Sequence, residues 1–397
     1  MFTQNPVFIP GPTNIPERLR RALDLPTMDH RSSGFAEMLP PLSDGIREIV
    51  KSRDAQIIIF PATGSAGWEA VITNTLSPGD RILAARHGMF SLRWIEMCRR
   101  HGLDCRVIER PWGEGAPAEA FAAELSADTG HEIKAVLVTH NETATGVRSD
   151  VAAIRQALDA ARHPALLMVD GVSSIASMDF RMEEWGVDCA VTGSQKGFML
   201  PAGLAITALS PKAFAAAETA GLSRAYLDIR DMAQANAKGG YPYTPPVALM
   251  AALGESLEML RTEGLDNVFV RHHRIAQGVR DAVSAWGLKL CAASPELYSD
   301  TVSAVVVPPG LDGQKVVKRA AEVYGVAFGA GLGDVAGQVF RIGHLGMMTD
   351  VMALSGIATA EMVMADMGVP IRLGSGVAAA QEYYRSTTGV PAVAGAA

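Results

Sequence analysis

The chain has 397 residues, of which 48% are apolar and 19% are charged. These fractions exclude a mainly disordered chain, and the length suggests two or three domain-sized units. The net charge is −7 and no Lys/Arg run is longer than two, which argues against a nucleic-acid-binding protein. The 39 glycines and 22 prolines follow no G-X-Y period, so we interpret them as many sharp turns.

Cysteine usage and the first residues bear on the compartment. The four cysteines form no C-x-x-C pair, which argues against a zinc ribbon or a disulfide scaffold and suits a reducing cytosol. Residues 1–16 contain four prolines and no positive charge, unlike a secretory signal, and no apolar run reaches the roughly 18 residues of a membrane span. We therefore expect a cytoplasmic protein with no metal site, no membrane contact and no nucleic-acid partner.

Short apolar runs alternate with helical patterns over the first half of the chain. The predicted strands are 56–60, 81–85, 104–108, 135–139, 165–170, 188–192 and 204–209. The predicted helices between several of them are 67–75, 90–101 and 151–161. Near-continuous apolar strands separated by helices predict an α/β fold whose mostly parallel sheet is covered on both faces.

The pattern changes after two long helical stretches. These stretches cover 245–261 and 267–286, and they are joined near Gly264. The strands and helices expected after them are 301–307, 313–324, 339–342 and 350–367, which predict a smaller α+β unit. We expect an N-terminal arm over 1–20, a large domain over 21–260, a small C-terminal domain over 261–397, and a frayed tail over 389–397.

Ligands of open α/β sheets bind beyond the carboxyl ends of the strands, so the residues that follow each strand are candidates. Thr63-Gly64-Ser65 follows the first strand and precedes a helix, where backbone N–H groups can hold a phosphate. His140–Gly146 follows the fourth strand and is a run of polar and small residues that suits a site loop. A helix N-cap with a turn glycine, and a solvated turn, are the plain structural alternatives.

Two ionisable residues stand at neighbouring strand ends. Asp170 ends the fifth strand, where a carboxylate is unfavourable unless it is paired, and Lys196 follows the sixth. Desolvated lysines of lowered pKa form Schiff bases. With the phosphate cradle, the pair suggests a pyridoxal phosphate site, in which the lysine carries the imine and the aspartate holds the pyridinium nitrogen. A structural ion pair and a surface lysine are the alternatives.

Two further residues fit such a site. Phe90 follows the second strand and is placed to stack on a flat cofactor, or else belongs to a helix core. Arg341 lies inside the apolar run 339–343, where a guanidinium needs a carboxylate. A substrate α-carboxylate and an interdomain salt bridge are the two interpretations.

These residues carry a family resemblance. The chain resembles the class V, fold-type I pyridoxal-phosphate aminotransferases, in particular the glyoxylate aminotransferases, over nearly its full length. The segments that carry the resemblance are Pro10–Pro16, Asp29–Ser32, His140–Gly146, Val169-Asp170, Gly193–Gly197, Tyr241–Pro246 and Phe340–Gly343. The resemblance implies a large domain with a mostly parallel seven-stranded sheet and a smaller α+β domain.

The resemblance also implies the roles of individual residues around the cofactor. Lys196 is similar to the Schiff-base lysine, and Asp170 to the partner of the pyridine nitrogen. The positions that resemble phosphate contacts are Thr63, Gly64, Ser65 and Gln195, although some relatives have His where Ser65 stands. Thr143 resembles the residue near the ring hydroxyl, and Phe90 stands where many relatives stack Trp.

Other positions resemble residues that bind substrate or act across a dimer interface. Tyr241 and Thr244 resemble residues that reach the phosphate of the neighbouring subunit, which implies a homodimer with shared active sites. Arg341 resembles the clamp for the substrate α-carboxylate. The further positions that resemble the substrate pocket are Gly11, His30 and Arg31, the last two across the interface.

The resemblance implies transfer of an amino group to glyoxylate, which gives glycine. Residues 4–10 and 226–232 resemble more closely the aspartate-dependent enzymes of the β-hydroxyaspartate route, whose other product is oxaloacetate. Serine- and alanine-dependent enzymes, which give hydroxypyruvate and pyruvate, are the alternatives. A dicarboxylate donor needs a second cation, which His30 or Arg31 can supply, but the same pair occurs in serine-type relatives.

Two other activities are weaker alternatives. A cysteine desulfurase-like lyase needs a nucleophilic cysteine on a loop near the cofactor, and residues 328–333 contain none. A nicotinamide dehydrogenase needs the motif G-x-G-x-x-G, which residues 329–334 match only in part because the third glycine is missing.

Overall fold

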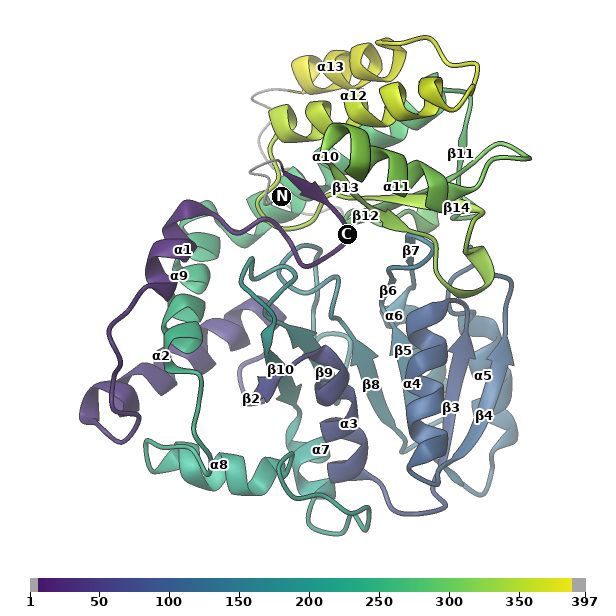
Figure 1. The fold of residues 1–397 in the computed structure, drawn as a ribbon. Coiled ribbons are helices and arrows are strands. Elements are labelled where there is room, and N and C mark those ends of the chain that lie inside the picture. The colour runs from purple at the N-terminus through teal and green to yellow at the C-terminus, as the bar shows by residue number, and fades with distance from the viewer. Residues whose placement is uncertain (1–5, 388–397) are drawn as a thin grey trace.

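A seven-stranded sheet forms the centre of the larger of two units in this computed structural model, which describes residues 6–387 (Figure 1). The strand order is β2-β10-β9-β8-β5-β3-β4. The strands are β2 Gln56–Ala62, β3 Arg81–Arg86, β4 Asp104–Glu109, β5 Ile133–Thr139, β8 Leu166–Asp170, β9 Cys189–Gly193 and β10 Gly203–Leu209. All seven predicted strands are present, with ends shifted by at most two residues.

Strand direction determines where a site can form. β10 is antiparallel to its neighbours β2 and β9, and every other pairing in the sheet is parallel. The carboxyl ends of β2, β3, β5, β8 and β9 therefore lie along one edge of the sheet. This topology confirms the predicted α/β fold with a mostly parallel sheet.

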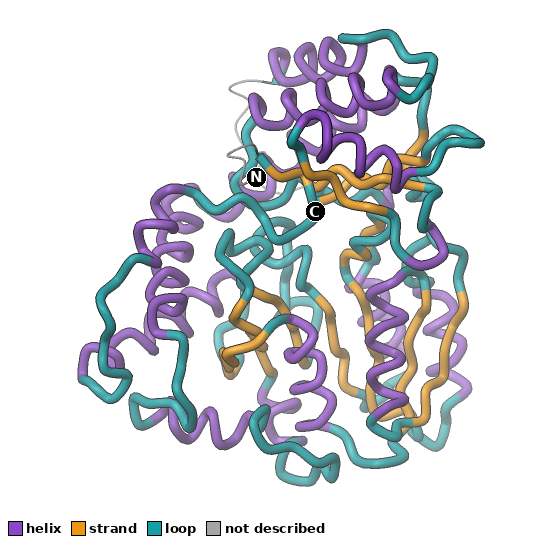
Figure 2. The backbone as a smooth tube through the Cα atoms, in the orientation of Figure 1, coloured by secondary structure: helices purple, strands orange, loops and turns teal. Residues whose placement is uncertain are grey.

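Helices cover both faces of the large sheet, as Figure 2 shows. On one face lie α1 Glu17–Leu23, α2 Ser33–Val50, α5 Ala118–Ala127, α6 Val151–Ala160 and α9 Val247–Glu263. On the other face lie α3 Gly64–Thr75, α4 Met89–Arg100, α7 Pro211–Ala216 and α8 Ile229–Ala237. The edge strand β4 is the least buried strand of this sheet, since three of its six residues are exposed and three are half-buried.

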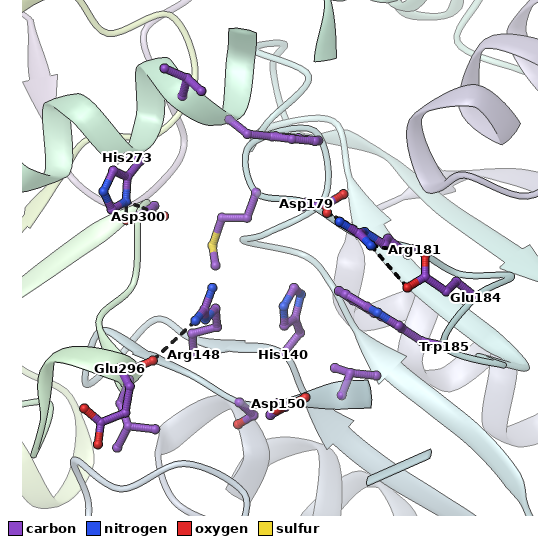
Figure 3. Close-up of a pocket in the computed structure, with 16 residues that line it drawn as sticks. His140, Arg148, Asp150, Asp179, Arg181, Glu184, Trp185, His273, Glu296 and Asp300 are labelled. Atoms are coloured by element: carbon purple, nitrogen blue, oxygen red, sulfur yellow. Dashed lines mark hydrogen bonds and ion pairs between the residues drawn. The ribbon is translucent and has the colours of Figure 1, made fainter. Parts of the chain in front are cut away.

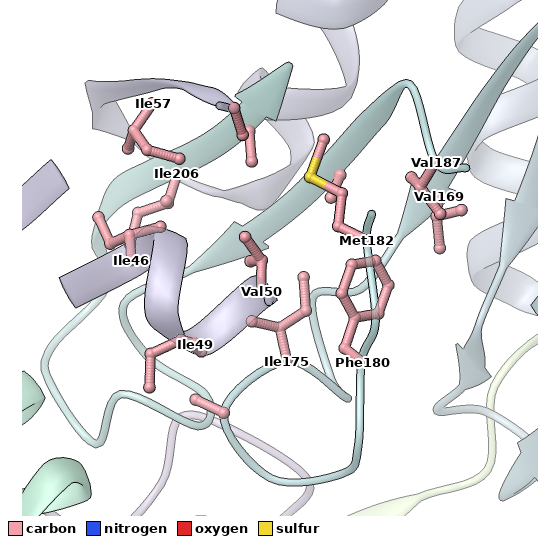
Figure 4. Close-up of a cluster of buried hydrophobic side chains, with 14 of the residues drawn as sticks. Ile46, Ile49, Val50, Ile57, Val169, Ile175, Phe180, Met182, Val187 and Ile206 are labelled. Atoms are coloured by element: carbon pink, nitrogen blue, oxygen red, sulfur yellow. The ribbon is translucent and has the colours of Figure 1, made fainter. Parts of the chain in front are cut away.

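The core between α2 and the sheet shows how these helices are held (Figure 4). Ile46, Ile49 and Val50 recur at helical spacing, so they lie on one face of α2 and pack against strand residues such as Ile57 and Ile206. This helix is absent from the predicted elements, and Pro40 and Pro41 inside it weaken the helical pattern. Burial of this apolar face outweighs the helix-breaking tendency of the two prolines.

The smaller unit has its own five-stranded sheet, in the order β1-β13-β14-β12-β11. Its strands are β1 Val7–Phe8, β11 Lys289–Leu290, β12 Val302–Val306, β13 Ala327–Ala330 and β14 Val339–Gly343. Its helices are α10 Leu265–Ala285, α11 Gly313–Tyr324, α12 Asp350–Asp366 and α13 Ser375–Ser386. Short elements complete the chain: a hairpin of β6 Asn141–Glu142 and β7 Val147–Arg148, and 3₁₀ turns at Pro295–Leu297 and Gly333–Val335.

α10 joins the two units. Its residue Val268 packs in the core beside the large sheet, whereas Ile275 packs in the core of the smaller unit. The division at 20 and 260 stays a prediction, and the tail expected over 389–397 lies outside the described residues. Between residues 6 and 387, no helix is long and apolar enough to cross a membrane.

The N-terminal strand belongs to the sheet of the smaller unit. β1 pairs in parallel with β13, and Phe8 is buried with its ring 5.8 Å from that of Phe328. Gly356 of α12 makes room for Phe8, because a Cβ at position 356 would approach the Phe8 ring to 2.7 Å. Val7 and Phe8 are therefore held by Ala327 and Phe328, which come more than 300 residues later in the sequence.

We expect Phe8→Ala to lower the free energy of unfolding by about 3 kcal/mol, because it removes a buried aromatic ring and leaves a cavity. Urea-induced unfolding followed by circular dichroism measures the change. Val351→Ala is the control, since Val351 is 77% exposed in the same unit and its truncation should change stability by less than about 0.5 kcal/mol. Equal losses in the two variants would show that β1 is not anchored as described.

Candidate active site

A cavity of about 260 Å³ lies at the carboxyl edge of the large sheet. Residues that follow β2, β3, β5, β8 and β9 meet there with the segment after β1. Nine residues singled out from the sequence line it: Gly11, Thr63, Gly64, Ser65, Phe90, Thr143, Asp170, Gln195 and Lys196. Residues chosen because they follow strand ends thus meet in one cavity, as expected for ligand sites of such sheets.

Lys196 lies in the turn after β9 and is only 9% exposed. Its Nζ donates a hydrogen bond to the carbonyl of Pro10, and no carboxylate among the described residues forms an ion pair with it. Gly11 packs against the amine, since a Cβ there would lie 2.5 Å from Nζ, and its φ of +104° also favours glycine. Burial, and then the charge of Arg341, lower the pKa of Lys196 to about 8.

Asp170 is the last residue of β8 and is buried. One carboxylate oxygen accepts a hydrogen bond from the backbone N–H of Val172 at 2.9 Å. Burial raises the pKa of Asp170 to about 7, and the nearby charge of Glu142 adds to the rise. The described residues supply no cation that ion-pairs with this carboxyl group, so a protonated ring nitrogen could pair with it and favour its ionised form.

The start of α3 offers an anion site beside these two residues. Thr63 is the N-cap of α3 but makes no side-chain capping hydrogen bond, so the first N–H groups have no side-chain acceptor. Gly64 is confined by Val172, which a Cβ at position 64 would approach to 2.6 Å. The Oε1 atom of Gln195 is buried without a hydrogen-bond partner in the described chain. The free N–H groups of this helix N-terminus fit a phosphate group, whereas the Oε1 atom of Gln195 is an acceptor and can pair only with a donor.

Arg341 reaches the site from the smaller unit. It lies in β14, is buried, and its Nε donates to the Ala330 carbonyl at 2.9 Å. Its Nη1 donates to the Thr143 carbonyl at 3.0 Å, so it contacts the edge of the cavity without lining it. Burial lowers the pKa of Arg341 to about 10, and within residues 6–387 it forms no ion pair. The guanidinium thus stays available for a carboxylate.

Four residues singled out from the sequence do not reach the cavity of their own chain. Tyr241 donates its hydroxyl to the Ile59 carbonyl at 3.1 Å, and Thr244 is exposed. Arg31 is exposed and His30 half-buried, both in a turn before α2. Their roles at a shared site stay predictions that require a second copy of the chain.

The cavity also includes residues that were not singled out. Trp68 lies one helical turn after Gly64, so the periodicity of α3 was the available signal. Ser173 accepts hydrogen bonds from Thr143 Oγ1 and Asn141 Nδ2, each at 2.8 Å. The Ser173 hydroxyl therefore holds the side chain expected beside the ring hydroxyl, a contact that no local pattern reveals.

A larger cavity, of about 780 Å³, lies between residues 178–185 and the start of α10 (Figure 3). None of the nine residues lines it, and its Arg181 is already paired with Asp179 and Glu184. His140 faces this cavity and binds Ser174 Oγ through Nδ1 at 2.9 Å. Size alone would favour this cavity, but the unpaired lysine and aspartate place the candidate active site in the smaller one.

Comparison with known proteins identifies the family. Residues 24–341 match the family model for aminotransferase class-V. An L-aspartate–glyoxylate aminotransferase of Paracoccus denitrificans is 68% identical over 388 residues, 98% of each chain. A serine–glyoxylate aminotransferase of Hyphomicrobium methylovorum is 53% identical over 95% of this chain and 94% of its own. The chain therefore belongs to the class-V aminotransferases, which depend on pyridoxal phosphate.

A solved structure agrees with this assignment. Pyridoxamine–pyruvate aminotransferase from Mesorhizobium loti superimposes with a TM-score of 0.90 at 28% identity. The match covers 97% of this chain and 99% of the other. Because the match covers nearly the whole chain, the similarity extends through both units.

We expect the amine of Lys196 to titrate near pH 8 in cofactor-free protein. Because burial lowers its pKa, the neutral, reactive form accumulates at lower pH than in an exposed lysine, whose pKa is about 10.4. Pulse labelling with acetic anhydride, read by mass spectrometry, should show the Lys196 rate levelling off above pH 8 while exposed lysines continue to gain reactivity. A Lys196 profile that parallels the exposed lysines would contradict the assignment.

Proposed function

We propose that the protein is a pyridoxal-phosphate-dependent aminotransferase that transfers the amino group of L-aspartate to glyoxylate, giving oxaloacetate and glycine. The observation that carries the proposal is a buried lysine and a buried aspartate, neither in an ion pair within the described chain, beside an uncapped helix N-terminus. The donor is supported by the 68% identity to an L-aspartate–glyoxylate aminotransferase.

The residues of the cavity fit the cofactor. Lys196 would bind it covalently, and Asp170 would pair with the ring nitrogen. Phosphate contacts would come from Thr63, Gly64, Ser65 and Gln195, with Phe90 on the ring face and Thr143 near the ring hydroxyl. When bound, pyridoxal phosphate supplies an electron sink that stabilises negative charge at the substrate α-carbon.

The protein residues divide the remaining work. Lys196, whose lowered pKa leaves much of its amine neutral near pH 8, takes up the α-proton and returns it as general base and acid. Arg341 holds the α-carboxylate of each substrate through its unpaired guanidinium. The donor leaves as its 2-oxo acid before glyoxylate enters, so both substrates use the same clamp in turn.

We also propose that the active unit is a homodimer in the cytoplasm. Tyr241, Thr244, His30 and Arg31 lie outside the cavity of their own chain, as residues that serve a partner's site would. The same region exposes a pair of aromatic rings, Tyr226 and Tyr243, with centroids 4.9 Å apart and ring planes tilted by 32°. The four cysteines are all unpaired, which a reducing compartment allows.

Two alternatives have different support. A serine donor is favoured by the 53% identity to a serine–glyoxylate aminotransferase, and it would use the same α-carboxylate clamp. A cysteine desulfurase-like reaction requires a thiol at the cofactor, and none of the four cysteines lines the cavity. The choice of donor therefore depends on what binds the substrate side chain.

A half-reaction panel tests the donor. The cofactor-loaded protein is mixed separately with aspartate, serine and alanine, and the loss of the cofactor absorbance band is followed by stopped flow. We expect aspartate to react fastest, and Lys196→Ala to show no such reaction with any donor because it lacks the covalent attachment. Fast conversion by serine without conversion by aspartate would overturn the proposed donor.

Arg31→Ala tests the second cation. If Arg31 binds the side-chain carboxylate of aspartate across the interface, its removal should raise KM for aspartate about 10-fold or more and change KM for serine less than about twofold. Arg21→Ala is the control, because Arg21 is also exposed but is paired with Glu17 in the preceding helix. Equal effects on the two donors would remove Arg31 from side-chain recognition.

A further inference from the structure

Glu142 is a fully buried carboxylate beside the cofactor cavity that the mechanism above does not use. It ends β6, and its two oxygens accept hydrogen bonds from three backbone N–H groups. The donors are Phe90 at 3.1 and 3.2 Å, Ser91 at 3.0 Å and Ala144 at 3.1 Å. Burial raises the pKa of Glu142, and the three donors oppose that rise. Burying a carboxylate costs free energy unless its oxygens are hydrogen-bonded, so the question is what these hydrogen bonds do for the fold.

The first turn of α4 supplies two of these three N–H donors. α4 begins at Met89, and its N-cap is Gly88, which has no side chain to accept from the first N–H groups. Glu142, in strand β6, supplies the acceptors that Gly88 lacks. The glycine is required for this, because a Cβ at position 88 would lie 2.2 Å from the carboxylate carbon of Glu142. Gly88 and Glu142 thus form one fitted pair.

The same contacts set one wall of the cavity. Phe90 lies in that first turn, its backbone is bonded to Glu142, and its ring lines the cavity. On the other side, Glu142 precedes Thr143, whose carbonyl accepts from Arg341. Glu142 forms no ion pair with Arg341 in the described chain, so the guanidinium stays available for a ligand. The negative charge of Glu142 nevertheless opposes the lowering of the Arg341 pKa by burial.

We propose that Glu142 is a positioning residue of the active site. Its carboxylate fixes the first turn of α4, and therefore the Phe90 ring, against the place where the cofactor binds. This proposal rests on the proposed function, because it requires that the cavity bind pyridoxal phosphate.

The test measures the dissociation constant of pyridoxal phosphate for cofactor-free protein, by fluorescence quenching. Glu142→Gln keeps the shape of the side chain but replaces one acceptor oxygen with an NH₂ group, which cannot accept from an N–H. We expect the dissociation constant to rise about 5- to 30-fold. Gly88→Ala, which displaces the Glu142 carboxylate without removing it, should produce a rise of the same order.

Glu361→Gln is a matched control. Glu361 is also a buried carboxylate, and it accepts from the backbone N–H groups of Gly374 and Gly376 at the start of α13, far from the cavity in the smaller unit. Its replacement should lower the melting temperature by a similar amount but change the cofactor dissociation constant less than twofold. If it weakens cofactor binding as much as Glu142→Gln does, the role of Glu142 is merely structural.

A double variant tests the route through Phe90. If Glu142 acts by placing that ring, then Glu142→Gln should weaken binding by less than about twofold when Phe90 is already alanine. The proposal would be overturned if the two substitutions raised the dissociation constant independently, so that the rise in the double variant equals the product of the two single rises. It would also be overturned if Glu142→Gln and Gly88→Ala both kept the wild-type dissociation constant. Failure of the wild-type protein itself to bind pyridoxal phosphate would instead refute the proposed function.

Discussion

The site depends on the burial of four ionisable side chains in one small region. Lys196, Asp170, Glu142 and Arg341 are all removed from water, yet no two of them form an ion pair in the described chain. Backbone groups stabilise them instead: the carbonyls of Pro10, Ala330 and Thr143 for the cations, and N–H groups for the carboxylates. Burial disfavours the charged form of each side chain. The amine of Lys196, the carboxyl group of Asp170 and the guanidinium of Arg341 are therefore free to pair with opposite charges on a ligand.

Chain topology makes this arrangement possible. The parallel strands bring Ser65, Asp170 and Lys196 to one edge of the large sheet, although they are far apart in sequence. The small sheet then completes the site from the other side, through Arg341 of β14 and through β1, which carries Pro10 and Gly11 over Lys196. Both contributions come from the same five-stranded sheet, so the position of the smaller unit controls how Lys196 is enclosed and where Arg341 meets the cavity.

The sequence predicted the features that leave a local pattern. Continuous apolar runs located the seven strands, and reading the residues after them located Lys196 and Asp170. It missed β1, which is two residues long among prolines, and α2, whose interior prolines argue against a helix. Glu142 lay within the predicted site loop, but its role was missed, because its partner Phe90 lies 52 residues away and a cap from another strand has no sequence signature. The proposed roles of Tyr241 and Arg31 at a partner's site come from the resemblance and from their place outside the cavity of their own chain.

Reductive trapping shows whether Lys196 carries the cofactor. The protein is incubated with pyridoxal phosphate, reduced with borohydride, digested, and mapped by mass spectrometry. We expect a phosphopyridoxyl group on the peptide that contains Lys196, at one group per chain, and its loss in Lys196→Ala. A label on another lysine, such as Lys212, or no label at all, would contradict it.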